Sequence, residues 1–396
     1  MSVRHLFLPA CILLAGCGGS SGATPSDVVV TDSAGVTILT SSGTDKPLPW
    51  TLTELALIGG EDEGPASFTR ATPFNVGVDG LDRIHVLDTE AMQLHRFSAT
   101  GEPLGSVGRA GGGPGEFAMP FALGVSQNGR RTVFDFGKRA LLEWGGDDSL
   151  LSEVQWPLGA SRFPTGVVEW HGDTLLLLTQ GRDSLVQDLA LTSIFGSDTV
   201  NLASLSRPRP AMQQFTCVAF SMAPLFSPSL QFNVGAGQIA VTREAAYVVD
   251  LFTAGGRRSI RRDITPTVPA PADARRLYPE GMTIRFSGGG DNGSCTTPAE
   301  EVAEKAGLAP FIPLVKEVAV APDGTLWVQR MTFVGEPAAT DVFNAEGRYL
   351  GTMAGRALPL GFLSGDRVLF AVEDAESGIT RIGVYQLTRN PESGTT

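Results

Sequence analysis

The chain has 396 residues, with 42 acidic and 30 basic side chains that give a formal net charge of −12. An acidic chain without a long basic run argues against a nucleic acid partner, because nucleic acid binding relies on clustered Lys and Arg. Beyond the first sixteen residues, no segment is long and apolar enough to cross a bilayer as a helix.

Residues 1–16 are predicted to be a lipoprotein signal peptide. A basic start is followed by an apolar run from Leu6 to Leu14, which is too short to span a membrane and is typical of a signal. The sequence Leu14-Ala15-Gly16-Cys17 resembles the lipobox of bacterial lipoproteins. That resemblance implies cleavage before Cys17 and attachment of lipid to it, and two or more acyl chains would anchor the protein stably. An ordinary secretory signal that ends nearby is the alternative.

Residues 17–35 are predicted to form a lipid-anchored flexible linker, because they begin with a stretch of Gly, Ser, Thr and Pro. The folded body is expected over residues 36–390, followed by a tail at 391–396. An anchored protein belongs in the cell envelope. Gly18, rather than Asp, follows the cysteine, and by resemblance to sorting in Gram-negative cells this favours the outer membrane. The sequence does not distinguish a periplasmic from a surface-exposed location of the folded body.

A glycine-rich stretch, GSVGRAGGGPGEF at residues 105–117, looks at first like a phosphate-binding loop. It has a degenerate copy, IGGEDEGPASF at residues 58–68, in which three carboxylates replace small residues. A phosphate loop requires a helix directly after it, whereas here Pro120 and a strand pattern follow. The stretch is therefore predicted to be the crossing between two repeated units, with glycines where side chains would clash.

The repeat extends through most of the chain. Residues 76–86 align with 318–328, and residues 97–107 align with 343–353, in a pattern of strand, tight turn and strand. Six units are expected, and their first strands are predicted near Val76, Leu123, Val167, Ile239, Val318 and Phe362. The last unit contains only three strands. The strand at residues 50–58 is predicted to complete it and so to close the ring.

These repeats resemble the NHL-type repeat, and the chain resembles the six-bladed β-propeller lipoproteins of bacteria. The motif is sharpest over residues 58–125, recognisable at 313–353 and weakest at 160–205. The resemblance implies an all-β fold, a six-bladed β-propeller of four-stranded antiparallel blades closed by an N-terminal strand. The expected fold also contains two inserted loops and one short helix. The resemblance implies a fold more firmly than an activity.

Two long gaps between units predict insertions at about residues 205–235 and 268–312. They contain Cys217 and Cys295, which in an exported chain are expected to form a disulfide worth roughly 4 kcal/mol; two buried free thiols are the alternative. Residues 297–307 have the signals of a capped helix. Irregular loops on a propeller commonly carry function, so we expect the insertions to form the surface that determines specificity.

Three aspartates, Asp88, Asp135 and Asp250, are interpreted as ending the second strand of three units. Aspartates repeating around a channel are typical of propeller hydrolases that use Ca²⁺. The preferred interpretation is that each side chain bonds to nearby backbone and shapes a turn. They are therefore weak candidates for a metal site.

The remaining polar candidates suggest no catalytic centre. His85, His95 and His171 do not have the spacing of a metal-binding motif, and packing or surface roles are expected for them. The arginine-rich stretch at residues 257–262 is expected to be a solvated strand or turn. No catalytic residue is predicted, because the expected folded body at residues 36–390 contains neither GxSxG nor a CxxC pair.

The sequence therefore favours an envelope lipoprotein whose propeller binds a ligand or partner without catalysis and without a cofactor. A protein, a peptide or a glycan would each fit as partner, and the sequence does not indicate an oligomeric state. The alternative is a metal-dependent, lactonase-like hydrolase with Ca²⁺ at the channel mouth. A third hypothesis is a structural partner in an envelope complex that binds no small ligand.

Overall fold

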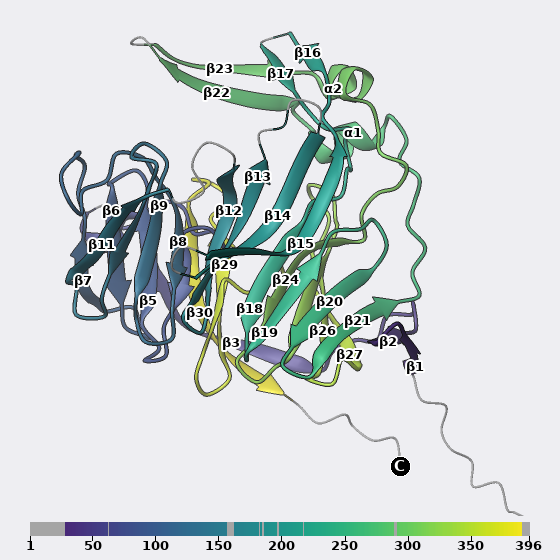
Figure 1. Ribbon diagram of the computed structural model, residues 1–396, viewed down its shortest axis with the longest axis horizontal. Helices are drawn as coiled ribbons and strands as arrows, with labels where there is room; N and C mark the ends of the chain where they lie inside the picture. Colours follow the sequence, from purple (N-terminus) through teal and green to yellow (C-terminus); the bar gives the residue numbers. More distant parts are fainter. Residues whose placement is uncertain are drawn as a thin grey trace, which may run out of the picture.

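Six antiparallel sheets form the blades of a propeller in the computed structural model (Figure 1). The structure describes residues 28–61, 63–156, 162–181, 183, 186–195, 198–216, 218–288 and 291–389. Apart from the N-terminal strands that join two of the sheets, the first strand of each blade in chain order is the inner strand, which lines the central channel. The predicted all-β, six-bladed propeller is confirmed.

The strands of each blade are given in order from the innermost to the outermost. Blade 1 contains β4 (Val76–Val78), β5 (Ile84–Asp88), β6 (Gln93–Phe97) and β7 (Pro103–Val107). Blade 2 contains β8 (Pro120–Val125), β9 (Arg131–Asp135), β10 (Ala140–Trp144) and β11 (Leu150–Gln155). Blade 3 contains β12 (Arg162–His171), β13 (Thr174–Gly181), β14 (Val186–Phe195) and β15 (Asp198–Pro208). Blade 5 contains β24 (Val315–Val320), β25 (Leu326–Arg330), β26 (Ala339–Phe343) and β27 (Tyr349–Ala354).

Blade 6 is completed by the N-terminal strand, as predicted. It contains β28 (Gly361–Leu363), β29 (Arg367–Glu373), β30 (Thr380–Arg389) and β3 (Trp50–Ile58). β3 pairs antiparallel with β30, from Trp50 opposite Arg389 to Ile58 opposite Ile382. Strands from the two ends of the described chain therefore share one sheet, which closes the ring.

Blade 4 has six strands instead of the expected four. It contains β18 (Gln231–Gly235), β19 (Gln238–Thr242), β20 (Val248–Thr253), β21 (Gly256–Arg262), β2 (Val36–Ser41) and β1 (Val28–Ser33). β2 runs parallel to β21, and β1 pairs antiparallel with β2. The expected linker at residues 17–35 is thus wrong for its last part, because the β-branched run of β1 adds a strand to this blade.

The inner strand of blade 4 also differs from the prediction. Ile239 lies in β19, the second strand, whereas β18 is the inner strand. β18 and β19 are joined by a tight turn at Ala236 and Gly237, and both have apolar residues in alternation. The insertion that precedes β18 interrupts the repeat pattern, so the sequence did not indicate where this unit begins. The other five predicted positions fall within β4, β8, β12, β24 and β28.

Two insertions lie between blades, and we call them together the cap (residues 209–230 and 263–314). The first contains β16 (Met212–Gln214) and β17 (Ala219–Ser221). The second contains α1 (Asp273–Leu277), β22 (Met282–Gly288), β23 (Asp291–Thr297) and α2 (Ala299–Ala306). α2 confirms the predicted helix and ends at Gly307, whose φ is 78°. The second helix, α1, was not predicted because its five residues carry no clear periodic pattern.

The two insertions emerge at the same end of the propeller. Each connects the fourth strand of one blade, counted from the channel, to the inner strand of the next, and such connections all lie at one end of the ring. Figure 1 shows β16, β17, β22, β23 and both helices together at one end of the molecule. Leu225 and Phe226 of the first insertion pack in one apolar cluster with Val302 and Ala303 of α2. The cap is therefore one packed unit.

The glycine-rich stretches are crossings between blades, as predicted. Gly59 follows β3 with a φ of 108°, and Gly108 follows β7 with a φ of 82°. A Cβ atom on Gly59 would lie 2.6 Å from the Phe68 ring, and one on Gly108 would clash with the Phe117 ring. Both phenylalanines are buried. The repeated glycine and phenylalanine thus form one packing unit in each crossing.

A Gly108→Ala substitution is expected to lower the free energy of unfolding by about 2 kcal/mol or more, through the left-handed backbone and the displaced Phe117 ring. Gly112→Ala is the matched control in the same loop, because Gly112 lacks a positive φ and a Cβ atom added to it would meet no atom within 4 Å. Denaturant unfolding of both variants tests the prediction. Equal losses in the two variants would contradict it.

Candidate functional site

A cavity of about 740 Å³ occupies the centre of the ring and is lined by the inner strands of all six blades. At the cap end its lining includes Pro73, Phe74 and Leu358, which precede inner strands. At the other end it includes His171, the last residue of β12, and Gly237, which lies in the turn after β18. The cavity is therefore a channel along the propeller axis.

Glycines let neighbouring inner strands approach closely around much of this channel. A Cβ atom on Gly77 would lie 2.5 Å from Val125 Cγ2, and one on Gly361 would lie 2.8 Å from Val78 Cγ2. In blade 2 a Cβ atom on Gly124 would lie 2.8 Å from the carbonyl oxygen of Val168 in blade 3. Any larger residue at these positions would separate the blades.

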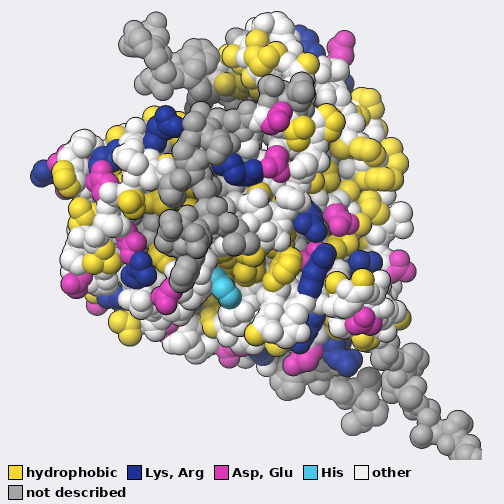
Figure 2. Space-filling model, viewed as in Figure 1, with side chains coloured by type: hydrophobic (Ala, Val, Ile, Leu, Met, Phe, Trp, Pro, Cys, Tyr) yellow, Lys and Arg dark blue, Asp and Glu magenta, His cyan; other side chains and the backbone are white. Residues whose placement is uncertain are grey.

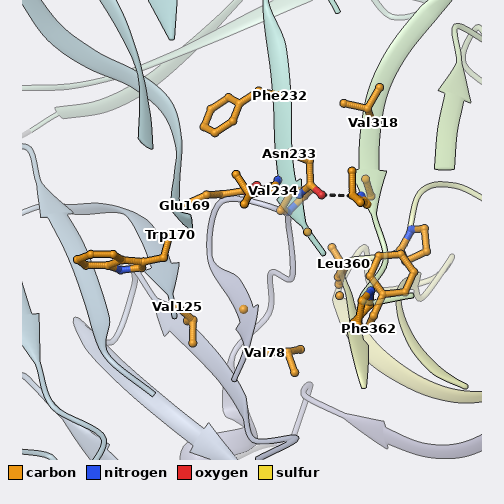
Figure 3. Close-up of a pocket in the computed structure, with 18 of the residues that line it drawn as sticks. Val78, Val125, Glu169, Trp170, Phe232, Asn233, Val234, Val318, Leu360 and Phe362 are labelled. Atoms are coloured by element: carbon orange, nitrogen blue, oxygen red, sulfur yellow. Dashed lines mark hydrogen bonds between the residues drawn. The ribbon is translucent and has the colours of Figure 1, made fainter. Parts of the chain in front are cut away.

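Polar side chains on the inner strands of blades 3 and 4 face the next blade around the ring. Glu169 of β12 accepts hydrogen bonds from Asn233 Nδ2 (2.8 Å) and from the backbone nitrogen of Val234 (2.6 Å) in β18. Asn233 Oδ1 in turn accepts from the backbone nitrogen of Val320 in β24, at 2.7 Å. Figure 3 shows Glu169 beside Val234 and Asn233, with the bond from Asn233 toward β24 drawn as a dashed line. A chain of side chains thus joins the inner strands of blades 3, 4 and 5.

Glu169 has an unusual protonation state for a carboxyl group. Burial inside the channel raises its pKa to about 8, against the opposing effect of the hydrogen bonds from Val234 and Asn233. At neutral pH the group is mostly protonated. The sequence analysis did not identify Glu169, because its partners lie more than sixty residues away in the chain. The available signal was a carboxyl group inside the otherwise apolar stretch Val167-Val168-Glu169-Trp170.

Apolar side chains line the part of the channel next to these polar groups. Val78, Val125, Leu360 and Phe362 surround the space next to Glu169 and Asn233 (Figure 3). Among the described residues that line the channel, the titratable side chains are Glu169, Glu317 and His171, and none is Lys or Arg. The channel therefore combines apolar walls with an acidic balance.

The three candidate aspartates are not brought together. Asp88 Oδ1 accepts hydrogen bonds from the backbone nitrogens of Glu90 and Ala91, both at 2.9 Å. Asp135 accepts from the backbone nitrogens of Ala118 and Lys138, both at 2.8 Å. The preferred interpretation, that these two side chains shape turns, is confirmed. Within the described part of the chain, no group of three His, Cys, Asp or Glu is placed to hold a metal ion.

Asp250 does not end a second strand, which corrects the prediction. It lies within β20, the third strand of blade 4, and forms an ion pair of 2.6 Å with Arg257. The shifted assignment of the blade's inner strand explains the error. The carboxylate of Asp250 therefore neutralises the positive charge of Arg257 on the neighbouring strand β21.

Two histidines are buried in blade 1, as expected. His85 Nε2 lies 2.9 Å from Asp79 Oδ2, and burial lowers the pKa of His85 in spite of this carboxylate. Burial alone would raise the pKa of Asp79, but hydrogen bonds from His85 and Arg83 outweigh it and lower the pKa to about 2. His95 Nδ1 bonds to Ser106 Oγ at 2.7 Å. These groups stabilise the turn and sheet of blade 1, whereas His171 lines the channel.

The arginine-rich stretch at residues 257–262 is only partly solvated, contrary to expectation. The side chains of Arg262 and Asp341 are both fully buried and lie 2.9 Å apart. Asp341 also accepts hydrogen bonds from Tyr247 Oη (2.8 Å) and Thr352 Oγ1 (2.6 Å). We call these four residues the Arg262 cluster. Alternation along β21 turns Arg262 inward, and its partners come from distant strands.

The anchor and the predicted disulfide stay predictions. Cys17 and Cys217 lie outside the described residues, as do the signal peptide and the tail at residues 391–396. Cys295 lies in β23 of the cap. In the described residues no helix has the length and apolar character needed to span a membrane.

Charges of both signs are intermixed on the molecular surface. On the face shown in Figure 2, Lys and Arg side chains alternate with Asp and Glu, and hydrophobic side chains are spread between them. This face therefore presents no broad basic area of the kind that binds nucleic acid.

Comparisons with known proteins identify the same fold. A family model described as 6-bladed beta-propeller, DUF5128, matches residues 73–182. A protein of Bacteroides fragilis described as exported is similar over 89% of this chain and 100% of its own, at 11% identity and a TM-score of 0.53. A member of the duf4221 family from Bacteroides vulgatus is similar over 87% of this chain and 100% of its own, at 6% identity and a TM-score of 0.51.

Other comparisons carry no argument about activity. A gluconolactonase from Xanthomonas campestris covers 88% of this chain and 98% of its own, but at 11% identity and a TM-score of 0.41. No curated protein matches the chain in sequence. The similarities to solved structures thus indicate the propeller fold and leave function to the site itself.

Proposed function

We propose that the protein is a lipid-anchored envelope protein whose propeller is a non-catalytic binding module, with the cap end as its binding surface. One observation carries the proposal: two insertions from different blades pack into a single unit at one end of the channel. The partner is an envelope protein, peptide or glycan. Attachment to the outer membrane through Cys17 is part of the same proposal.

Specific contacts hold the two insertions together. The backbone nitrogen of Leu225 donates to the carbonyl of Gly307 at 2.9 Å, and Ala309 donates back to Leu225 at 2.8 Å. Glu301 of α2 accepts from the backbone nitrogen of Thr216 at 2.7 Å and pairs with Lys305 at 2.8 Å. Ordering two long connections costs conformational entropy. These contacts offset that cost and give the cap a defined shape.

Exposed apolar side chains occur at this end of the molecule. Met212 of β16 is 68% exposed, and Val334, whose backbone nitrogen bonds to Arg276 of α1, is 64% exposed. Near the channel mouth the exposed rings of Phe74 and Phe121 lie 6.5 Å apart. Exposed aromatic and Met side chains are enriched at protein interfaces. This distribution supports a binding surface at the cap end.

Removal of the cap tests the proposed function. A variant with residues 209–230 and 263–314 replaced by short turns is compared with the wild type by crosslinking and pull-down from intact cells. We expect the partners of the wild type to be lost, while circular dichroism shows that the propeller is retained. Capture of the same partners by the capless variant would overturn the proposal.

A Cys17→Ser substitution is expected to release the protein from the membrane fraction almost completely, because the lipid would have no site of attachment. Cys11→Ser is the matched control, since Cys11 would be removed with the signal peptide. Cell fractionation followed by immunoblotting measures the effect. Retention of the Cys17→Ser variant in the membrane fraction would contradict lipid anchoring.

A further inference from the structure

We propose that the central channel binds an organic cation with an apolar body, and that Glu169 accepts its ammonium group. This inference goes beyond the proposed function, because the site lies inside the ring and not on the cap surface. The channel volume of about 740 Å³ falls in the range of small-molecule sites.

The charge of the channel wall favours a ligand with a positive charge. Among the described lining residues, Glu169 and Glu317 are acidic, and no Lys or Arg opposes them. Interactions between charges are stronger in a partly dehydrated channel than in bulk water. An anion would meet two carboxyl groups without a fixed positive partner, whereas a cation would be attracted.

The position of Glu169 suits an ammonium group. One of its oxygens accepts a hydrogen bond from Asn233, and the other accepts from Val234. Each carboxylate oxygen has two lone pairs, so each keeps one for a further donor. An ammonium group has three donors and no acceptor, and therefore complements a carboxylate that already holds two fixed donors.

The surrounding side chains suit an apolar body. Val78, Val125 and Leu360 supply aliphatic surface, and Phe362 adds an aromatic ring near the same space. Phe74 lines the cap end of the channel and is exposed there. A ligand that enters past Phe74 would thus bury apolar surface along the channel and reach Glu169 with its charged end.

Binding of a cation should be coupled to loss of a proton. Glu169 is mostly protonated at neutral pH, since burial raises its pKa to about 8, and a nearby cation favours the ionised form. Affinity is therefore expected to rise with pH toward 8. The groups facing Glu169 from β18 are uncharged, whereas Glu317 on β24 and His171 on β12 also line the channel.

Three probes of equal chain length test the proposal by calorimetry on the mature chain: octylammonium, octanol and octanoate. At pH 7 we expect octylammonium to bind at least tenfold more tightly than octanoate. Glu169→Gln should weaken octylammonium binding at least tenfold and leave octanol binding within about twofold. Glu90→Gln, at an exposed carboxyl outside the channel, is the matched control and should change neither.

Proton release provides a second readout that folding defects do not imitate. Titrations of octylammonium in two buffers of different ionisation heat should show proton release by the wild type and none by Glu169→Gln. Equal affinity of the wild type for all three probes, or binding of none of them, would overturn the proposal. Either result leaves the cap test unaffected, so failures of the two proposals are distinguishable.

Discussion

Replacing Arg262 by Ala is expected to lower the free energy of unfolding by about 3–5 kcal/mol. The substitution removes the closer of the two cationic partners of the fully buried Asp341 carboxylate, and Arg330 remains 3.7 Å from it. Removal of one member of a buried ion pair is costly because the remaining charge has lost its solvation by water. Tyr247 and Thr352 still donate hydrogen bonds to Asp341 but cannot neutralise its charge.

A second loss adds to this effect. The Arg262 guanidinium donates to the carbonyl oxygens of Ser42 (3.1 Å) and Thr44 (2.8 Å) and pairs with Asp45 at 3.0 Å. These residues belong to the connection between β2 and β3, and β3 closes the ring. The Arg262 cluster therefore ties the ring-closing segment to blades 4 and 5.

Urea unfolding of Arg262→Ala and of Arg275→Ala measures the difference. Arg275 is the matched control, because its pair with Glu300 is exposed on both sides and exposed pairs contribute little. We expect no change for Arg275→Ala beyond experimental scatter. A loss of less than about 1 kcal/mol for Arg262→Ala would contradict the structural role assigned to the cluster.

Relative to Glu169→Gln, the wild type is expected to lose stability as the pH rises from about 5 to 8. The pKa of Glu169 is about 8 in the folded state and near its ordinary value of 4.5 when unfolded. Between these values the folded state keeps a proton that the unfolded state releases, so a higher pH favours unfolding. Because Glu169 keeps some contact with channel water, we expect roughly 2 kcal/mol across this range.

Chemical unfolding of both proteins at several pH values between 5 and 8 checks this prediction. The stability of Glu169→Gln relative to the wild type should increase steadily with pH. Asp79 does not interfere, because its lowered pKa of about 2 makes it lose its stabilising effect only as the pH falls below about 4. Parallel pH profiles for the two proteins would contradict the buried, protonated state of Glu169.

Repeated local patterns made most of the fold predictable from the sequence. The glycines and phenylalanines of the two crossings recur because each crossing packs a ring on a glycine, as with Gly108 and Phe117. The missing fourth strand of the last unit identified β3 as the closing strand. Local patterns did not predict the strands that lie where the repeat is interrupted. The insertion before β18 obscured the start of blade 4, and β1 lies in a segment whose Gly and Ser residues predict a linker.

The candidate site was less predictable, because its contacts join residues that are distant in the chain. Glu169 binds Asn233 and Val234 across a blade boundary, and no local pattern marks such a contact. Arg262 likewise reads as part of an exposed basic run until Asp341 is placed beside it. The signal that the sequence does carry is the carboxyl group of Glu169 inside an otherwise apolar predicted inner strand.

The most direct test of the proposed binding surface is site-specific photo-crosslinking in intact cells. A photoreactive residue is placed at Met212 or Val334, at the cap end, and at Leu81, in the turn after an inner strand at the opposite end. Leu81 is 74% exposed and is therefore as accessible as the other two. We predict discrete crosslinked partners from the two cap-end positions and none from Leu81. Crosslinks from Leu81 alone, equal crosslinks from both ends, or none from Met212 and Val334 would contradict the account.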